Sequence, residues 1–186
     1  QGTLASHVLG YIQDGSGMMG MEMALNDRLA DPNTRGTPIS LSLDVRVQGA
    51  LEDELRRGML AVDAIGAAGI VLDVDTGEVL ALASLPEFDP NNVRTTDKVA
   101  ADNSNLPPPV FNRATNAVFE LGSTIKSLTF ASAIDAGIIT TLSQKWDATP
   151  FKIGSYEFND DKPKGESLNV VEALMYSSNV VTARVA

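Results

Sequence analysis

Residues 123–136 constrain the fold of this chain more than any other stretch of its sequence. The segment has a helical pattern with apolar side chains on every side, and Gly137 ends it. A helix that is apolar all round is expected to be buried, so other elements must surround it. The chain has 186 residues, of which 44 % are hydrophobic. That is enough to bury a core, and the length suits one domain or one domain plus part of a second.

Lys126 is the exception within this apolar helix. Burying an unpaired ammonium is costly, so Lys126 must have hydrogen-bonding partners or a lowered pKa. Ser123 precedes it by three residues, and side chains at that spacing share a helical face. Gly122 places Ser123 at the helix start, where free N–H groups stabilise a developing oxyanion. The pattern predicts a serine nucleophile activated by a desolvated lysine.

The Ser-x-x-Lys pattern alone is weak, because it arises by chance about once in a chain of this length. Ser123 would then be a plain helix cap and Lys126 would extend to the surface. A second pattern, Ser-x-Asn at residues 177–179, supports the catalytic interpretation. The Ser177 hydroxyl can relay a proton, and the Asn179 amide can bind Lys126 and orient a substrate amide.

Residues 167–169 also match Ser-x-Asn, and we interpret them as helix capping. Asn169 and Glu172 have the spacing of a capping box for a helix over 170–176.

Composition excludes several classes of site. The sequence has no cysteine, which excludes disulfides, thiolate metal sites and cysteine nucleophiles. Its one histidine, His7, does not suffice for a multi-histidine metal site, and a Ser-His-Asp triad would need that residue. We therefore expect no metal and no cofactor. The net charge of −10, without a basic stripe, argues against nucleic acid as a partner.

The remaining pattern predicts a mixture of helices and strands. Asp44 stands where an N-cap would begin a helix over 45–62. An Asp-Thr-Gly turn at residues 75–77 is expected to join the two strands of a hairpin. The other expected elements are a helix over 21–29, a linker over 31–38, a strand over 39–43, a surface loop over 91–105 and a hairpin over 151–158.

Seven segments, taken in order, resemble the class B penicillin-binding proteins, which are D,D-transpeptidases of peptidoglycan synthesis. The similarity extends over nearly the whole chain and is greatest to the division-specific penicillin-binding protein 3 type. The segments are 17–22 (GMMGME), 41–48 (LSLDVRVQ), 73–81 (DVDTGEVLA), 88–92 (FDPNN), 111–115 (FNRAT), 119–126 (FELGSTIK) and 176–180 (YSSNV).

The resemblance implies an α+β fold, the α/β sandwich of the penicillin-binding protein and serine β-lactamase type, incomplete in this chain. Residues 1–37 would be the C-terminal tail of an N-terminal pedestal (dimerisation) domain plus a linker. Residues 38–186 would be the N-terminal part of the transpeptidase domain. The parent protein would be anchored in the bacterial inner membrane with its catalytic domain in the periplasm. The anchor would lie outside this sequence, in which no stretch approaches the length of apolar chain that spans a membrane.

The resemblance also implies a reaction and its residues. Ser123 would attack a peptidoglycan stem pentapeptide to form an acyl-enzyme, which the amine of a second stem resolves. Lys126 would be the general base, Ser177 the relay, and Asn179 the group that positions the substrate. The Ser123 main-chain N–H would form half of the oxyanion hole. β-Lactams would acylate Ser123, and other division proteins of the membrane would be partners.

The sequence departs from the family in three places. It contains no Lys-Thr-Gly or Lys-Ser-Gly, the motif that supplies the other half of the oxyanion hole, so this chain alone is not expected to be active. Leu121 stands where proline is common, and the passage over 28–37 is short. The alternatives are an elongation-type penicillin-binding protein 2, a class D type β-lactamase or β-lactam sensor, and a non-catalytic cell-wall scaffold.

Overall fold

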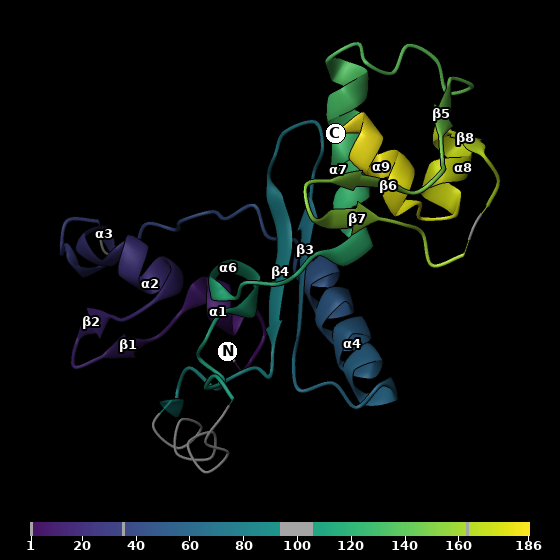
Figure 1. Cartoon of the computed structure of the whole chain (residues 1–186). Helices are drawn as coiled ribbons and strands as arrows, with labels where there is room; N and C mark the ends of the chain where they lie inside the picture. The colour runs from purple at the N-terminus through teal and green to yellow at the C-terminus, as the bar shows by residue number, and fades with distance from the viewer. Residues whose placement is uncertain (1, 35, 94–105, 163) are drawn as a thin grey trace. The chain divides into compact units, whose positions relative to one another are not determined.

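The computed structural model describes residues 2–34, 36–93, 106–162 and 164–186. The chain forms two compact units, Gln1–Val118 and Phe119–Ala186 (Figure 1). These are units of packing, and the domain boundary expected between residues 37 and 38 stays a prediction. Most of the expected surface loop over 91–105 lies outside the described residues.

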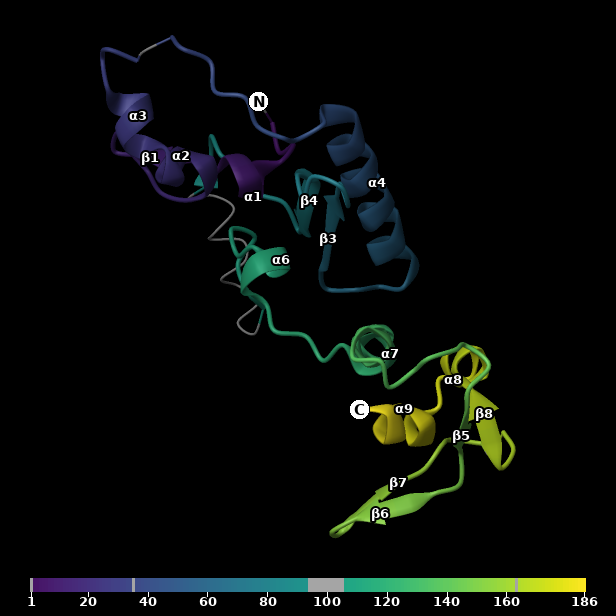
Figure 2. The same cartoon turned by 90° about the horizontal axis from the view of Figure 1, so that it is seen from above.

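The first unit is built around an antiparallel hairpin of β3 (Ala67–Leu72) and β4 (Val79–Leu85), which confirms the predicted hairpin. In its turn, the Asp73 carboxylate accepts hydrogen bonds from the main-chain N–H groups of Asp75 and Thr76. Helix α4 (Val45–Ala61) packs along the hairpin (Figures 1 and 2).

Helix α4 begins where the sequence predicts. The Asp44 side chain accepts from the N–H groups of Arg46 and Val47, the N-cap arrangement that favours a helix start. On its inner side Gln48 is 1 % exposed. The Gln48 amide donates to the Leu82 carbonyl and accepts from the Leu82 N–H, each over 2.9 Å. The helix is thereby joined to the main chain of β4.

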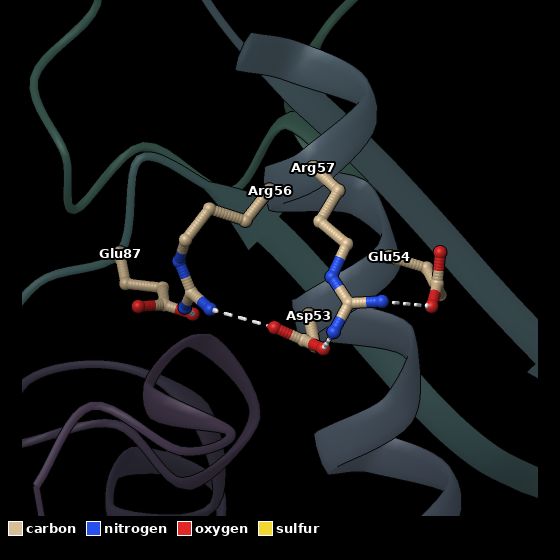
Figure 3. A network of polar contacts seen from close by, with 5 residues as sticks. All are labelled: Asp53, Glu54, Arg56, Arg57 and Glu87. Atoms are coloured by element: carbon tan, nitrogen blue, oxygen red, sulfur yellow. Dashed lines mark hydrogen bonds and ion pairs between the residues drawn. The ribbon is translucent and has the colours of Figure 1, made fainter. Parts of the chain in front are cut away.

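A network of charged side chains lies on the outer side of α4 (Figure 3). Arg57 bridges Asp53 at 2.6 Å and Glu54 at 3.1 Å. Arg56 lies 3.9 Å from Asp53 and reaches Glu87, beyond β4, at 2.7 Å. The pairs within α4 are solvent-exposed, so we expect each to contribute only about 0–1 kcal/mol to stability.

Two predictions for the first unit are wrong. Residues 39–43 form no strand, because only single hydrogen bonds join this stretch and Asp44 to β4: Ser42 Oγ donates to the Val79 carbonyl, and the Asp44 N–H donates to the Leu80 carbonyl. The helix expected over 21–29 is two short helices, α2 (Gly20–Ala24) and α3 (Asn26–Ala30), which are separated at Leu25.

The beginning of the chain packs into this same unit. It forms α1 (Ser6–Leu9) and a small hairpin of β1 (Ile12–Gln13) and β2 (Ser16–Gly17). The buried His7 ring bonds to the Pro109 carbonyl through Nε2 over 2.7 Å and lies edge-on to Phe88. Burial lowers the pKa of His7. These contacts give His7 a structural role.

The short helix α6 (Arg113–Asn116) also contacts β3 and β4.

The described residues of the second unit form three α-helices, a short 3-10 helix and two small antiparallel ribbons. A short 3-10 turn, η1 (Gly122–Thr124), leads into α7 (Ile125–Asp135). Strands β5 (Lys145–Asp147) and β8 (Ser167–Asn169) pair, as do β6 (Phe151–Ile153) and β7 (Tyr156–Phe158), which form the predicted hairpin. Helices α8 (Val170–Met175) and α9 (Asn179–Val185) complete the unit. The capping box predicted for α8 is present, with both Asn169 and Glu172 hydrogen bonds at 2.9 Å.

The core of the second unit lies between α7, α8 and α9. Its members are buried side chains from these helices and the segments beside them: Phe130, Ala133, Ile139, Ala148, Leu168, Val170, Ala173, Val181 and Val185. The expectation that α7 is buried all round is wrong for this chain. Its residues Lys126, Phe130 and Ala133 are buried, whereas Leu128 is 59 % exposed. The reason is that α8 and α9 cover only part of the α7 surface within this unit.

Candidate active site

Ser123 lies in the 3-10 turn that opens α7. The preceding Gly122 has φ +55, in the left-handed region that favours glycine, and a Cβ there would meet open space. The glycine is therefore needed for the turn and not for close packing. One turn later, Lys126 is 6 % exposed, as its place in the apolar helix predicts.

Lys126 and Ser123 are connected through Ser177. The Lys126 ammonium donates to the Ser177 Oγ over 2.9 Å and also to the Ser177 carbonyl. The Ser177 hydroxyl in turn donates to the Ser123 Oγ over 2.9 Å. The described hydrogen bonds include none directly between Ser123 and Lys126. The serine and the lysine thus meet through a third side chain, which the sequence assigned as a relay.

Ser177 owes its position to the way α8 ends. The Ser177 N–H donates to the Leu174 carbonyl and the Ser178 N–H to the Ala173 carbonyl, which together form a Schellman turn. Glycine is usual at the left-handed position of this turn, but here Ser177 occupies it with φ +56. Left-handed backbone in a residue other than glycine is unfavourable and clusters at functional sites. The turn directs the Ser177 hydroxyl toward Ser123 and Lys126.

The electrostatics of Lys126 favour a base. Burial lowers the pKa of Lys126, because the charged form loses its hydration, and the carboxylate of Asp160 has a smaller effect that raises it. A lysine whose pKa is lowered in this way exists in part as the neutral amine at lower pH than a free lysine does. The neutral amine can accept a proton from a hydroxyl.

Asn179 lies at the same cavity as these residues, and the described hydrogen bonds include none between it and Lys126. It is the first residue of α9, and its side-chain Nδ2 donates to the Asn159 carbonyl over 3.4 Å. The bond to Lys126 expected from the sequence is absent from the described contacts. Asn179 lines the same cavity as Ser123 and Lys126.

A cavity of about 450 Å³ brings the predicted residues together within the second unit. Ser123, Lys126 and Asn179 line it, and Ser177 contacts two of these side chains. Tyr156 and Glu157 of β7 and the following Asn159 also line it. The cavity therefore combines a hydroxyl, an amine, an amide and an exposed aromatic ring.

Asp160 is a further residue of this region that the sequence analysis missed. Its carboxylate binds Ser178 and the first N–H groups of α9. It lies 18–20 residues before these partners and belongs to no local capping pattern. The hydrogen-bonding requirement of the α9 N-terminus was the signal that could have found it.

Other kinds of site receive no support from the described residues. These contain no group of three or more histidine, aspartate or glutamate side chains placed to hold a metal ion. Within the same residues, no helix has the length and apolar character of a membrane span.

Comparison with known proteins adds three findings. Residues 67–186 match the family model of the penicillin binding protein transpeptidase domain. The chain is 39 % identical over 187 residues to the probable peptidoglycan D,D-transpeptidase FtsI of Caulobacter vibrioides, covering 100 % of this chain and 30 % of the relative. It is 32 % identical over 148 residues to the peptidoglycan D,D-transpeptidase FtsI of Escherichia coli K12, covering 80 % of this chain and 23 % of the relative.

Solved structures agree with the family match. The D,D-transpeptidase domain of a peptidoglycan glycosyltransferase from Eggerthella lenta superposes with a TM-score of 0.80 and 30 % identity, covering 99 % of this chain and 42 % of that one. Penicillin-binding protein A of Mycobacterium tuberculosis, solved as its penicillin G acyl-enzyme, gives a TM-score of 0.76 at 23 % identity, covering 100 % and 48 % of the two chains. The second match concerns the fold alone.

The chain spans less than a third of the length of the two curated relatives described above. The matches confirm the α+β transpeptidase fold and the resemblance to class B, FtsI-type proteins. The chain belongs to the penicillin-binding protein transpeptidase family.

Proposed function

We propose that this chain carries the nucleophile and the base of a peptidoglycan D,D-transpeptidase. The observation that carries the proposal is the hydrogen-bonded series from Lys126 through Ser177 to Ser123. This arrangement meets the requirement for an activated nucleophile, namely a hydroxyl within reach of a base that a third group orients.

The first half-reaction forms an ester. The Ser123 Oγ attacks the carbonyl of the penultimate D-alanine of a stem pentapeptide, and the Ser123 proton passes to the neutral amine of Lys126, through Ser177. As the tetrahedral intermediate collapses, the peptide bond to the terminal D-alanine breaks. The proton moves to the leaving amine, and D-alanine departs.

The second half-reaction returns the serine. The amine of a neighbouring stem attacks the ester carbonyl and gives up a proton to the base. A new peptide bond forms between the stems while the bond to Ser123 Oγ breaks, and the base returns the proton to Ser123 Oγ. Asn179 would orient the substrate amide, since its side chain lines the cavity. The Ser123 N–H would be one donor to the oxyanion.

A β-lactam would follow only the first half-reaction. Its strained amide would acylate Ser123, and the leaving nitrogen would remain tethered to the acyl group. We expect this acyl-enzyme to be long-lived, whereas a β-lactamase would release the same kind of ester by rapid hydrolysis.

The proposal is tested by labelling the full-length protein that contains this chain with a fluorescent penicillin. We expect wild type to label stably and Ser123→Ala not to label. Ser127→Ala is the matched control, because the Ser127 hydroxyl is on the same helix and donates to the Thr124 carbonyl. Equal labelling of Ser123→Ala and wild type would favour the non-catalytic scaffold, and hydrolytic release of penicillin within seconds would favour a β-lactamase.

We propose further that the full-length protein acts in septal cell-wall synthesis. The relatives described above share the FtsI name, and that similarity supports this role over elongation. The active domain would lie in the periplasm, held by an anchor in the inner membrane, with other division proteins of the membrane as partners. Depletion of the protein should give filamentous cells without septa, whereas rounded cells would indicate the elongation role.

A further inference from the structure

The Asp160 carboxylate binds the segment that carries Ser177 and Asn179. Asp160 follows β7, and its Oδ2 accepts from the Ser178 hydroxyl over 2.6 Å. Its Oδ1 accepts from the main-chain N–H groups of Asn179 at 2.5 Å and Val180 at 3.0 Å. Both oxygens are thus engaged, and all three donors lie in consecutive residues.

These three donors immediately follow the relay serine in the chain. Ser178 is 1 % exposed and also caps α9, since its Oγ accepts from the Val181 N–H at 3.1 Å. Asp160 therefore fixes the residue between Ser177 and Asn179. Hydrogen bonds that ionised carboxylates accept from N–H and O–H donors are about twice as strong as those between neutral groups.

We propose that Asp160 is a positioning residue for the acylation of Ser123. Its carboxylate holds Ser178 and the start of α9 in place. The Ser177 hydroxyl therefore stays within hydrogen-bonding distance of Ser123 and Lys126, and Asn179 stays at the cavity. This inference rests on the proposed function of Ser123 and Lys126.

Asp160 also acts on Lys126 by its charge. Other charged and titratable groups stand on the described elements near Lys126. Glu157 of β7 lines the same cavity but pairs with Lys152 at 3.6 Å. Arg184 of α9 binds Asp147, and the Glu172 carboxylate caps α8. Tyr156 also lines the cavity. Asp160 is the group whose charge raises the pKa of Lys126 against the larger lowering by burial.

These two roles have different kinetic consequences. Loss of the three hydrogen bonds lets Ser177 and Asn179 move, which lowers the acylation rate at every pH. Loss of the negative charge lets the pKa of Lys126 fall further, so the neutral amine persists to lower pH. The acidic limb of the rate profile should therefore move to lower pH in a variant that lacks the charge.

The experiment measures the second-order rate of acylation by a fluorescent penicillin across the pH range, in the full-length protein. We expect Asp160→Ala, which removes the carboxylate and its three hydrogen bonds, to lower the plateau rate at least tenfold and to move the acidic limb to lower pH. Asp161→Ala is the matched control, because this neighbouring carboxylate is exposed, and it should leave both quantities unchanged. Ser178→Ala removes one of the three donors without changing the charge, and it should lower the plateau with the limb unmoved.

The folded fraction of each variant is measured by thermal unfolding, and the acylation rate is divided by that fraction. Partial misfolding of a variant therefore does not change the rate that is compared. A plateau for Asp160→Ala within twofold of wild type overturns the inference. So does a lower plateau with an unmoved acidic limb, because Asp160 would then serve only the fold. A wild type that is not acylated at Ser123 overturns the proposed function itself, a result distinct from either of these.

Discussion

The Ser178 N–H donates to the Ala173 carbonyl over 2.9 Å, and this bond closes the turn that holds Ser177 in left-handed backbone. The hydroxyl that links Lys126 to Ser123 is therefore placed by a main-chain conformation that is unfavourable for serine. The chemistry of the Ser177 hydroxyl and the conformation of the Ser177 main chain can be tested separately.

Substitution of Ser177 should separate these two properties. Ser177→Ala and Ser177→Gly both remove the hydroxyl, so each should slow acylation of Ser123 at least about 100-fold. Glycine relieves the left-handed strain and alanine does not, so the glycine variant should be about 1 kcal/mol more stable than the alanine variant. Acylation kinetics and thermal unfolding measure the two effects. Equal stability of the variants would contradict the assigned strain.

Replacement of Lys126 by methionine should abolish acylation without unfolding the protein. Burial lowers the pKa of Lys126 from its ordinary value of 10.5, so between its two pKa values the unfolded chain binds more protons than the folded one. Wild type should therefore gain stability relative to Lys126→Met as pH rises through that window. Urea unfolding of both proteins at about pH 7 and about pH 10 measures the difference. A difference that does not change with pH would show that Lys126 is hydrated in the folded state.

The buried amide of Gln48 should contribute strongly to the first unit. Gln48→Ala leaves the Leu82 N–H and carbonyl without their side-chain partner and removes the bond from Gln48 to Glu52. Unsatisfied buried groups cost about 1–3 kcal/mol each, so we expect a loss of about 3 kcal/mol. The matched control is Arg57→Gln, on the exposed side of α4, which should change stability by about 0.5 kcal/mol or less. Denaturant unfolding of both variants compares them.

Glu52 should make the stability of the protein depend on pH. Burial raises the pKa of Glu52 above its ordinary value of 4.5, so wild type loses stability as pH rises through the interval above that value. Glu52→Gln has no such loss, and its amide oxygen can still accept the bonds from Ala5 and Gln48 that Glu52 Oε1 accepts. The stability of Glu52→Gln relative to wild type should rise between about pH 4 and about pH 7.

The exposed Glu54 provides the control for that experiment. Its carboxylate pairs with Arg57 on the outside of α4, where solvent screens the interaction. Glu54→Gln should therefore show a nearly constant difference from wild type over the same pH interval. A similar trend in both variants would assign the pH dependence to the surface of the helix.

Local patterns predicted the elements whose hydrogen bonds are local. The helix from Val45, its Asp44 cap and the capping box of Asn169 follow from residues within four positions of one another. The strand expected over 39–43 failed because alternation of apolar and polar residues does not establish a partner. Its neighbour β4 is reached only by isolated bonds.

The site was predictable in its members and less so in its connections. Ser123, Lys126, Ser177 and Asn179 were chosen by residue type and spacing, and the structure places all four at one cavity or in contact with it. The sequence placed the Asn179 amide on Lys126, whereas it contacts Asn159. Side-chain direction across two loops depends on tertiary packing, which short motifs do not encode. Asp160 was missed for the same reason, because its contacts with Ser178 and the start of α9 depend on tertiary packing.

Helix α8 lies between two Ser-x-Asn triplets, one before its first residue and one after its last. The first triplet caps the start of α8, and the second begins in the Schellman turn that ends α8. The length of α8 therefore sets the phase between them: deleting one residue would rotate the second triplet by about 100° and draw it back by about 1.5 Å. The cap at Asn169 would survive such a deletion, but the Ser177 hydroxyl would no longer face Ser123. A helix of six residues thus serves as the spacer that gives one of two identical patterns its chemistry.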